Sequence, residues 1–223
     1  MLKAQLHTHT NSDPRDRWIS YSEKELIDRA ASEGYEVLSI TCHDKLVFTE
    51  ELRKYAEGKG ILLLPGIEIV IENSDVLIIN ATEKAKEIES FQDLKRYKYR
   101  NPNSLIVAPH PYFKKRSLGK KLKKKLSLFD AIEYSFFYSD KLNLNKRAEK
   151  LGLPMLGTSD THFIDTLDTT YSLIDADKTP ESIVRAIKQG KIEIKTKPLG
   201  IPRMAGIVFK MSTGKITKLV KTG

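Results

Sequence analysis

The sequence contains a single cysteine, Cys42, which excludes an intramolecular disulfide and a cysteine-based zinc finger. It also lacks an apolar run of the roughly 18 to 20 residues that a membrane-spanning helix needs. The N-terminal segment Met1–His9 carries histidines where a secretory signal peptide would need an apolar stretch, so we expect a cytoplasmic protein without membrane association. Any metal ion in this protein must be held by histidine, aspartate and glutamate.

Acidic residues are fewer than basic ones, with 29 Asp and Glu against 38 Lys and Arg, and the net charge is +9. This excess of positive charge favours anionic partners such as phosphorylated metabolites or nucleic acid. The 223 residues, 40% of them hydrophobic, suit one compact domain with a sizeable core.

Short β-rich runs alternate with amphipathic stretches, which is the pattern of parallel strands joined by helical crossovers in an α/β protein. The predicted strands are Lys3–His7, Glu36–Thr41, Ile61–Leu64, Val76–Asn80, Leu105–Ala108, Ala131–Ser135, Pro154–Gly157, Tyr171–Asp175 and Ile192–Lys195. The predicted helices are one that begins at a Ser22/Glu25 capping box, then Glu50–Gly58, Glu83–Tyr99, Lys120–Leu128, Asp140–Leu151 and Pro180–Gln189.

Residues 199–223 depart from this alternation. Ile207–Met211 and Ile216–Val220 flank the turn-like segment Ser212–Gly214, so we predict a β-hairpin-like extension of the domain formed by residues 1–198.

The histidines fall at or just beyond the C-terminal ends of predicted strands, which gather at one rim of a parallel α/β barrel or sheet. One residue separates His7 from His9, so both side chains leave the same face of an extended chain, and Asp160 and His162 repeat this spacing. A lone His-x-His pair also occurs on surface strands, but the whole set indicates a metal site. Its histidines are His7, His9, His43, His110 and His162, and carboxylates at similar positions are Asp13, Glu68, Asp75 and Asp160. Since a carboxylate can bridge two cations, we expect two or three divalent ions.

Five segments occur in order along residues 1–195: Leu6–Thr10, Ile40–Asp44, Gly66–Glu68, Pro109–Pro111 and Gly157–His162. Together they resemble the motifs of the PHP family, the polymerase and histidinol phosphatase domain. The resemblance implies a distorted seven-stranded, TIM-like (β/α) barrel with a metal cluster at the C-terminal rim of the strands.

The resemblance also implies how the ligands are shared. It places His7, His9, Glu68 and Asp160 around one ion, Glu68 and His110 around a second, and His43, His162 and a loop residue around a third. Asp13 is our choice for that loop residue, with Asp16 as the alternative. Asp75 stands where many members carry a histidine, and additional oxygen ligands tilt the preference from Zn toward Mn or Fe.

Two further residues near the motifs have open roles. Glu133 either orients a ligand histidine or is a strand-end charge in solvent. Cys42 stands where the family usually has aspartate, and it is either a buried inert thiol or a functional one.

Clustered divalent metals suit phosphoester hydrolysis because they lower the pKa of a bound water and neutralise phosphate oxygens. We therefore predict a metal-dependent phosphoesterase that hydrolyses a phosphomonoester or a nucleotide or oligonucleotide phosphate through a metal-bound hydroxide. Asp160 and His162 are the predicted catalytic residues. Either His162 or a metal-bound water protonates the leaving group.

A basic run follows His110, and its first residues, Lys114, Lys115 and Arg116, are the predicted substrate-binding residues. The same run has apolar residues at helical spacing, such as Leu118 and Leu122, so it is also consistent with the solvated face of a packed helix. The predicted partner is a phosphorylated small molecule or a nucleotide, with no obligate protein partner.

Three alternative functions stay open at this point. One is a histidinol-phosphatase-type metabolite phosphatase. Another is an amidohydrolase, which normally has a longer barrel and a metal-bridging lysine. The third is a catalytically weak nucleic-acid-binding or assembly subunit, similar to the barrel protein of archaeal ribonuclease P.

Overall fold

The computed structural model describes residues 1–113 and 116–219, with side chains described as far as Lys210. The strands are β1 (Leu2–Gln5), β2 (Val37–Ile40), β3 (Leu62–Ile71), β4 (Ser74–Ile79), β5 (Leu105–Ala108), β6 (Ala131–Ser135), β7 (Met155–Thr158), β8 (Thr170–Ile174) and β9 (Ile192–Thr196). The helices are α1 (Glu23–Ser32), α2 (Glu50–Gly58), α3 (Phe91–Arg100), α4 (Lys121–Lys125), α5 (Asn145–Glu149), α6 (Pro180–Lys188) and α7 (Ile201–Leu219), with 3-10 turns η1 (Glu83–Glu87), η2 (Leu126–Leu128) and η3 (Ile164–Thr166).

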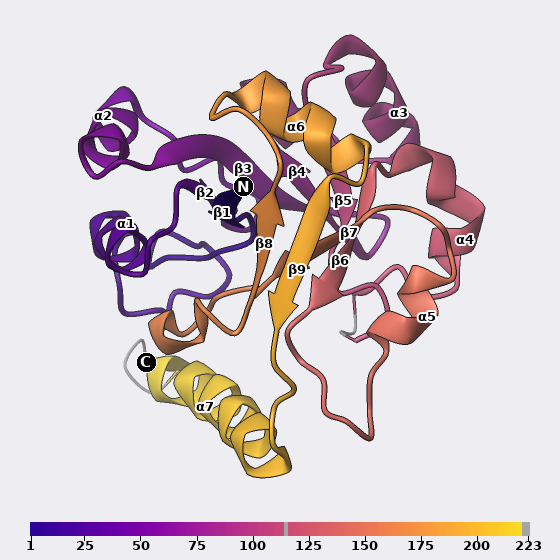
Figure 1. Ribbon diagram of the computed structural model, residues 1–223. Helices are drawn as coiled ribbons and strands as arrows, with labels where there is room; N and C mark the ends of the chain where they lie inside the picture. Colours follow the sequence, from indigo (N-terminus) through magenta and orange to yellow (C-terminus); the bar gives the residue numbers. More distant parts are fainter. Residues whose placement is uncertain (114–115, 220–223) are drawn as a thin grey trace.

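One sheet of nine strands forms the centre of the protein, in the order β7-β6-β5-β4-β3-β2-β1-β8-β9 (Figure 1). Its two ends approach each other, because the Ser172 hydroxyl on β8 donates to the Gly157 carbonyl on β7 and accepts from the Gly157 amide, both at 3.0 Å. The sheet is therefore a nearly closed barrel. The strands predicted from the residue pattern are all present, whereas the count of seven implied by the family resemblance is wrong for this chain.

The sheet is mixed rather than fully parallel. β1, β2 and β3 are parallel neighbours, as are β5, β6 and β7. β4 runs antiparallel between β3 and β5, and β8 runs antiparallel between β1 and β9. The β3–β4 connection is a two-residue turn, Glu72–Asn73, in which both residues have positive φ. This is the backbone of a tight hairpin turn, and it replaces the helical crossover that the alternating pattern predicts.

Local signals set the ends of several helices as the sequence predicts. The Ser22 and Glu25 side chains form the capping box that begins α1, and α2 has the predicted bounds. Pro180 occupies the first turn of α6. The predicted helix over residues 83–99 is instead divided, because Ser90 forms a second capping box with Asp93 and starts α3 anew. The helical parts of residues 120–128 and 140–151 are also shorter than predicted.

The predicted C-terminal hairpin is wrong, because residues 201–219 form the helix α7. Met204 and Ile207, three residues apart, pack with Leu199 and Phe136 on one side of this helix. That packing outweighs the β-branched composition and the Ser-Thr-Gly segment, which had suggested a turn. Val220, the end of the expected second strand, lies outside the described residues. None of the helices in the described part of the chain has the length and apolar character needed to cross a membrane.

Side chains from most of the strands fill the barrel interior, and α6 covers one of its ends (Figure 1). Ile183, Val184 and Ile187 of α6 pack in the same cluster as Val37 and Leu105, the first residues of β2 and β5. The C-terminal ends of the parallel strands therefore face the opposite end of the barrel. The candidate ligands lie at that opposite end.

Candidate metal centre

The structure gathers the predicted histidines and carboxylates at this rim. His7 and His9 follow β1, His43 follows β2 and His110 follows β5. Asp160 and His162 follow β7, Glu68 lies within β3, and Asp75 is near the start of the antiparallel β4. All of these side chains are buried. Parallel strands thus bring together residues that are up to 155 positions apart in the sequence, from His7 to His162.

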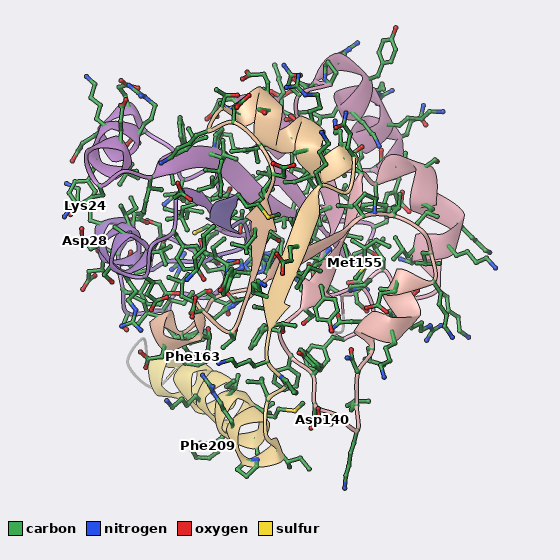
Figure 2. All side chains as sticks on the ribbon, viewed as in Figure 1. Lys24, Asp28, Asp140, Met155, Phe163 and Phe209 are labelled. Carbon is green, nitrogen blue, oxygen red and sulfur yellow. The ribbon has the colours of Figure 1, made fainter. Side chains whose placement is uncertain are left out.

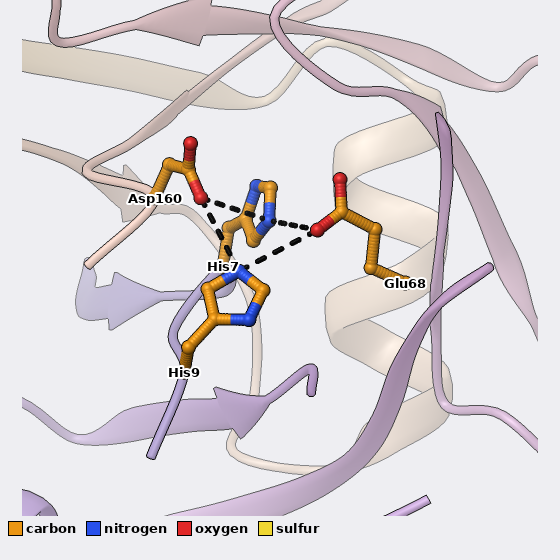
Figure 3. Close-up of side chains that lie close together, drawn as sticks. All are labelled: His7, His9, Glu68 and Asp160. Carbon is orange, nitrogen blue, oxygen red and sulfur yellow. Dashed lines mark hydrogen bonds and ion pairs between the residues drawn. The ribbon is translucent and has the colours of Figure 1, made fainter. Parts of the chain in front are cut away.

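Four of these side chains meet at the centre of the cluster (Figure 3). The Nε2 atom of His7 lies 3.3 Å from both Glu68 Oε2 and Asp160 Oδ1. The Nε2 atom of His9 lies 3.2 Å from the same Asp160 oxygen and 3.5 Å from the same Glu68 oxygen. Two ring nitrogens and two carboxylate oxygens therefore converge on one point.

Glu68 also contacts two further histidines. Its Oε2 atom lies 3.1 Å from His43 Nε2, and its Oε1 atom lies 3.1 Å from His110 Nε2. Asp75 adds a carboxylate on the His110 side, with its Oδ2 atom 4.0 Å from His110 Nε2. Because its two oxygens face different histidines, Glu68 has the position of a bridging ligand.

Asp13 and Asp16, the alternative loop residues, have different surroundings. Asp16 Oδ2 lies 3.2 Å from His162 Nε2 and 3.7 Å from His43 Nδ1. Asp13 instead accepts hydrogen bonds from the backbone amides of Arg15, Asp16 and His43, and faces the Nδ1 atoms of His9 and His43. Asp13 is therefore engaged by its own loop and also forms a candidate ligand group with His9 and His43, whereas Asp16 contacts His162 through Nε2 and His43 through Nδ1.

Four of the histidine rings have a hydrogen-bonding partner at Nδ1, on the side of the ring away from the cluster. His7 Nδ1 lies 2.8 Å from Glu133 Oε1, and His9 and His43 Nδ1 lie 2.8 and 2.9 Å from Asp13 Oδ2. His162 Nδ1 donates to the Asp160 backbone carbonyl at 2.9 Å. A proton on Nδ1 leaves the Nε2 lone pair of each ring directed at the cluster, which is the tautomer that a metal-bound imidazole needs.

Glu133 is completely buried, so the solvent-exposed alternative for this residue is wrong. The Thr158 hydroxyl and the His110 backbone amide both donate to its carboxylate in addition to the His7 contact. The arrangement makes Glu133 a positioning residue for His7.

The electrostatics of the cluster couple its acids and bases strongly. Burial alone would lower the pKa of His7, but the negative charges of Asp160 and Glu133 raise it well above its usual value. Burial likewise opposes ionisation of Glu68, yet His7 and His43 hold the pKa of this carboxyl well below its usual range. A positive charge at the centre is therefore stabilised by the surrounding carboxylates.

The donor set fits divalent metal ions. Among the described residues, Nε2 of His9 is buried and makes no hydrogen bond although it faces the Glu68 and Asp160 oxygens, and a buried polar atom without a hydrogen bond is costly. Imidazole and carboxylate ligands together suit Zn, Mn and Fe rather than a soft thiolate-seeking ion. A cation among these atoms would satisfy lone pairs that otherwise face one another.

Two of these residues have unusual backbone conformations. His110 and Asp160 have φ values of 28° and 43°, in the region that non-glycine residues seldom occupy. Such conformations persist where the surroundings hold them, and they are concentrated at functional sites. Here each of them follows a parallel strand, β5 or β7, and bears a side chain of the cluster.

The predicted substrate-binding residues are only partly described. Lys114 and Lys115 lie outside the described residues. The Arg116 carbonyl accepts a hydrogen bond of 2.9 Å from the Asp75 amide, so this segment does pass beside the cluster. Further along, Leu118 and Leu122 are buried in the core, whereas Lys121, Lys123 and Lys124 are exposed. This part of the basic run is therefore the solvated side of a packed helix.

Cys42 behaves as the inert alternative predicts. The side chain is buried, and burial raises the pKa of the thiol to about 12. Its closest polar neighbour is the Thr10 hydroxyl at 3.5 Å.

Sequence reasoning missed Trp18. Its indole Nε1 donates to Asp16 Oδ1 at 2.9 Å, and its ring stacks on His162 at a centroid distance of 5.9 Å. The available signal was the position of the chain's lone tryptophan, two residues after a candidate ligand in a loop that has to approach the metal site.

Comparison with known proteins agrees with this architecture. The model of the family PHP_C, described as PHP-associated, matches residues 144–192. The chain also superposes, with a TM-score of 0.69, on a two-domain protein from Bacteroides vulgatus described as containing a predicted PHP-like metal-dependent phosphoesterase. The alignment covers 94% of this chain and 69% of that structure, at 18% identity.

Two other solved structures share the fold of this chain. PsfC from Pseudomonas syringae aligns with a TM-score of 0.60 at 17% identity, over 95% of this chain and 98% of its own. An amidohydrolase from Chromobacterium violaceum, with bound sulfate and no metal, aligns with a TM-score of 0.50 at 17% identity, over 71% and 87% of the two chains. At these identities the likeness concerns the fold alone. No curated protein sequence matches the chain.

Proposed function

We propose that this protein is a metal-dependent hydrolase that cleaves a phosphoester, either a phosphomonoester or a nucleotide or oligonucleotide phosphate. The observation that carries the proposal is the orientation of the imidazole rings. The Nε2 atom of each of the five histidines faces a carboxylate oxygen, four of them facing Glu68. The similarity to a protein described as containing a PHP-like metal-dependent phosphoesterase supports the choice of reaction.

The proposed ligands form three sets, of which the first two share Glu68, and together they would hold two or three ions. His7, His9, Glu68 and Asp160 form the first set, and Glu68, Asp75 and His110 form the second. We place His43, His162 and Asp16 in the third set, on the contacts of Asp16 with His43 and His162. Asp16 replaces Asp13 in the third set because Asp13 accepts hydrogen bonds from three backbone amides and from the Nδ1 sides of two rings. Asp13 thereby becomes a positioning residue for His9 and His43.

When bound, the metal ions supply a water of lowered pKa and neutralise the phosphate oxygens. In the reaction one water oxygen forms a bond to phosphorus while the ester P–O bond breaks, and the leaving oxygen takes up a proton. When the third set holds no ion, His162 is placed to hold that proton at Nε2, because it lines the pocket beside the cluster while its Nδ1 is fixed by the Asp160 carbonyl. When His162 binds an ion, a metal-bound water would supply the proton instead. Asp160 holds the rings of His7 and His9 at the reacting centre.

Arg116, with Lys114 and Lys115 before it, remains our proposal for attracting the phosphate. The described part of this segment borders Asp75 through its backbone, so a side chain leaving it has a short path to the cluster. A positive charge at the rim would partly offset the repulsion between an incoming phosphate and the buried carboxylates.

The test is phosphate release by Mn²⁺-reconstituted protein from sugar phosphates, histidinol phosphate, mononucleotides and short oligonucleotides, with a chelated control. We expect chelator-sensitive release from at least one substrate. Glu68→Gln should lower the rate of phosphate release by more than about 100-fold, which exceeds the loss expected when a residue that only orients a ligand is changed.

The matched control is Glu149→Gln, which changes an exposed glutamate on α5 and should leave the rate unaltered. Release that persists in excess chelator, or that survives Glu68→Gln, would contradict the proposed function.

A further inference from the structure

A second site lies beside the metal cluster, in a pocket of about 370 Å³ between the loops of the rim and the C-terminal helix α7. Trp18, His162, Phe163 and Asp165 line it from the rim, and Arg203 and Lys210 line it from α7. His162 belongs both to this pocket and to the candidate ligands. The pocket therefore opens directly onto the place where a scissile phosphate would be held, and its volume lies within the range of small-molecule sites.

The rim side of the pocket is aromatic and fixed. The Trp18 ring stacks on His162 with an interplanar angle of 17° and contacts the Phe163 ring at a centroid distance of 5.0 Å. Its Nε1–H is held by Asp16. Because the ring is held by neighbours on two sides, it presents a rigid apolar wall to a planar group at low entropic cost.

The opposite side of the pocket is positively charged. Residues 194–223 contain no aspartate or glutamate but seven lysines and arginines, and two of these, Arg203 and Lys210 on α7, line the pocket. Lys210 Nζ lies 5.8 Å above the Phe163 ring. Asp165, on η3, also lines the pocket and places one carboxylate beside these two cations.

Apolar packing holds this charged helix against the rim. Ile207 and Leu199 are buried against Phe136, and Met204 and Phe163 pack in the same cluster. In Figure 2 the Phe163 side chain lies between the rim and α7, whereas Phe209 projects from the outer side of the helix. The position of Arg203 and Lys210 is thus set by the buried side of α7.

We propose that this pocket binds the alcohol part of the substrate, and that this part is a planar ring bearing a second negative charge. The inference rests on the proposed phosphoester hydrolysis and names the class of ester. The ring lies against Trp18 and Phe163, and the second anionic group pairs with Arg203 and Lys210. Arginine is suited to this contact because its planar fork binds carboxylate and phosphate groups with two hydrogen bonds.

The first test compares two esters that differ by one charge, phenyl phosphate and 4-carboxyphenyl phosphate, with the Mn²⁺-loaded full-length protein. We expect a KM about tenfold lower for the carboxylated ester, because a charge-assisted hydrogen bond contributes a binding free energy of that size. Arg203→Ala should bring the ratio of the two KM values close to one. Asp165→Asn removes a negative charge from the pocket and should increase the preference for the carboxylated ester. Arg185→Ala is the matched control, since it removes an exposed arginine from the distant α6.

The second test needs neither metal nor turnover. Trp18 is the only tryptophan of the chain, so its emission reports on this pocket. Chelator-treated protein is titrated with 4-hydroxybenzoate, the product of the charged ester, and with phenol. We expect saturable quenching by 4-hydroxybenzoate, a roughly tenfold weaker affinity for phenol, and the same loss of affinity in Arg203→Ala.

The two proposals fail in different ways. Hydrolysis of both esters with equal KM, together with no quenching by 4-hydroxybenzoate, would overturn the pocket assignment and leave the phosphoesterase intact. Saturable quenching that depends on Arg203, without hydrolysis of any ester, would support the pocket and overturn the proposed reaction.

Discussion

Glu133 and Asp13 hold three imidazole rings by their Nδ1 atoms, on the side away from the candidate ions. Glu133 does this for His7, and Asp13 for His9 and His43. Neither carboxylate has to contact an ion to affect metal binding. A ring that is already fixed loses less conformational freedom when an ion binds, and a hydrogen-bonded imidazole is a stronger electron-pair donor to the metal. The cluster therefore depends on residues outside its ligand set.

Glu133→Gln tests this dependence. The amide keeps the size of the side chain but removes the negative charge facing His7, so we expect Mn²⁺ affinity to fall about 10- to 100-fold with little change in fold. Isothermal titration of chelator-treated protein measures the affinity, and circular dichroism checks the fold. Affinity within twofold of the wild type would show that His7 needs no such support.

The sequence allowed most of the central residues to be predicted, because histidines at strand ends have few other reasons to recur. The sequence could not show which of Asp13 and Asp16 is the loop ligand, because the two residues lie three positions apart in the same loop. Only the fold shows that three backbone amides surround Asp13 and that Asp16 faces His162. Glu133 was equally ambiguous, since a polar residue in a short strand can point either into the barrel or into solvent.

At the scale of elements, closure of the barrel depends on how closely β7 approaches β8 and β9. A Cβ atom on Gly157 would lie 2.8 Å from the Tyr171 carbonyl oxygen and 2.8 Å from the Ile194 side chain. The backbone of β8 cannot move away without breaking the paired Ser172 hydrogen bonds. Glycine at this position is thus a packing requirement of the last strand pair.

We predict that Gly157→Ala lowers the free energy of unfolding by about 1 to 3 kcal/mol, the usual cost of overpacking a close contact. Urea unfolding followed by circular dichroism gives the value. Gly58→Ala is the matched control, because Gly58 ends α2 with ordinary φ and open space around its Cβ position, and alanine there should be neutral or stabilising. Equal stabilities of the two variants would mean that the barrel is not tightly closed at β7.

Elements were predictable where local signals decide them. Capping residues, the strand-forming runs and the first-turn proline each act within a few residues, and the corresponding elements are present. The C-terminal hairpin failed because its residues, rich in isoleucine and valine, suit a strand locally but pack as a helix against Phe136 and Phe163. The strand count of seven failed because it came from a resemblance, while the residue pattern itself contained nine runs.

Across the whole molecule, α6 covers one end of the barrel and the candidate metal centre occupies the other, with α7 beside it (Figure 1). The protein as a whole carries a charge of +9, yet its buried rim collects acidic side chains around the histidines. Such a concentration of buried carboxylates is costly unless cations are bound among them. Divalent ions would remove this cost and stabilise the folded state by mass action.

Metal content tests this account most directly. Protein is loaded with Mn²⁺, freed of excess metal by gel filtration and measured by inductively coupled plasma mass spectrometry, alongside Glu68→Gln and Asp16→Asn. We predict two or three equivalents in the wild type, loss of at least one in Glu68→Gln, and loss of the third-set ion alone in Asp16→Asn. A folded wild-type protein that retains no metal at saturating Mn²⁺, Zn²⁺ or Fe²⁺ would contradict the account.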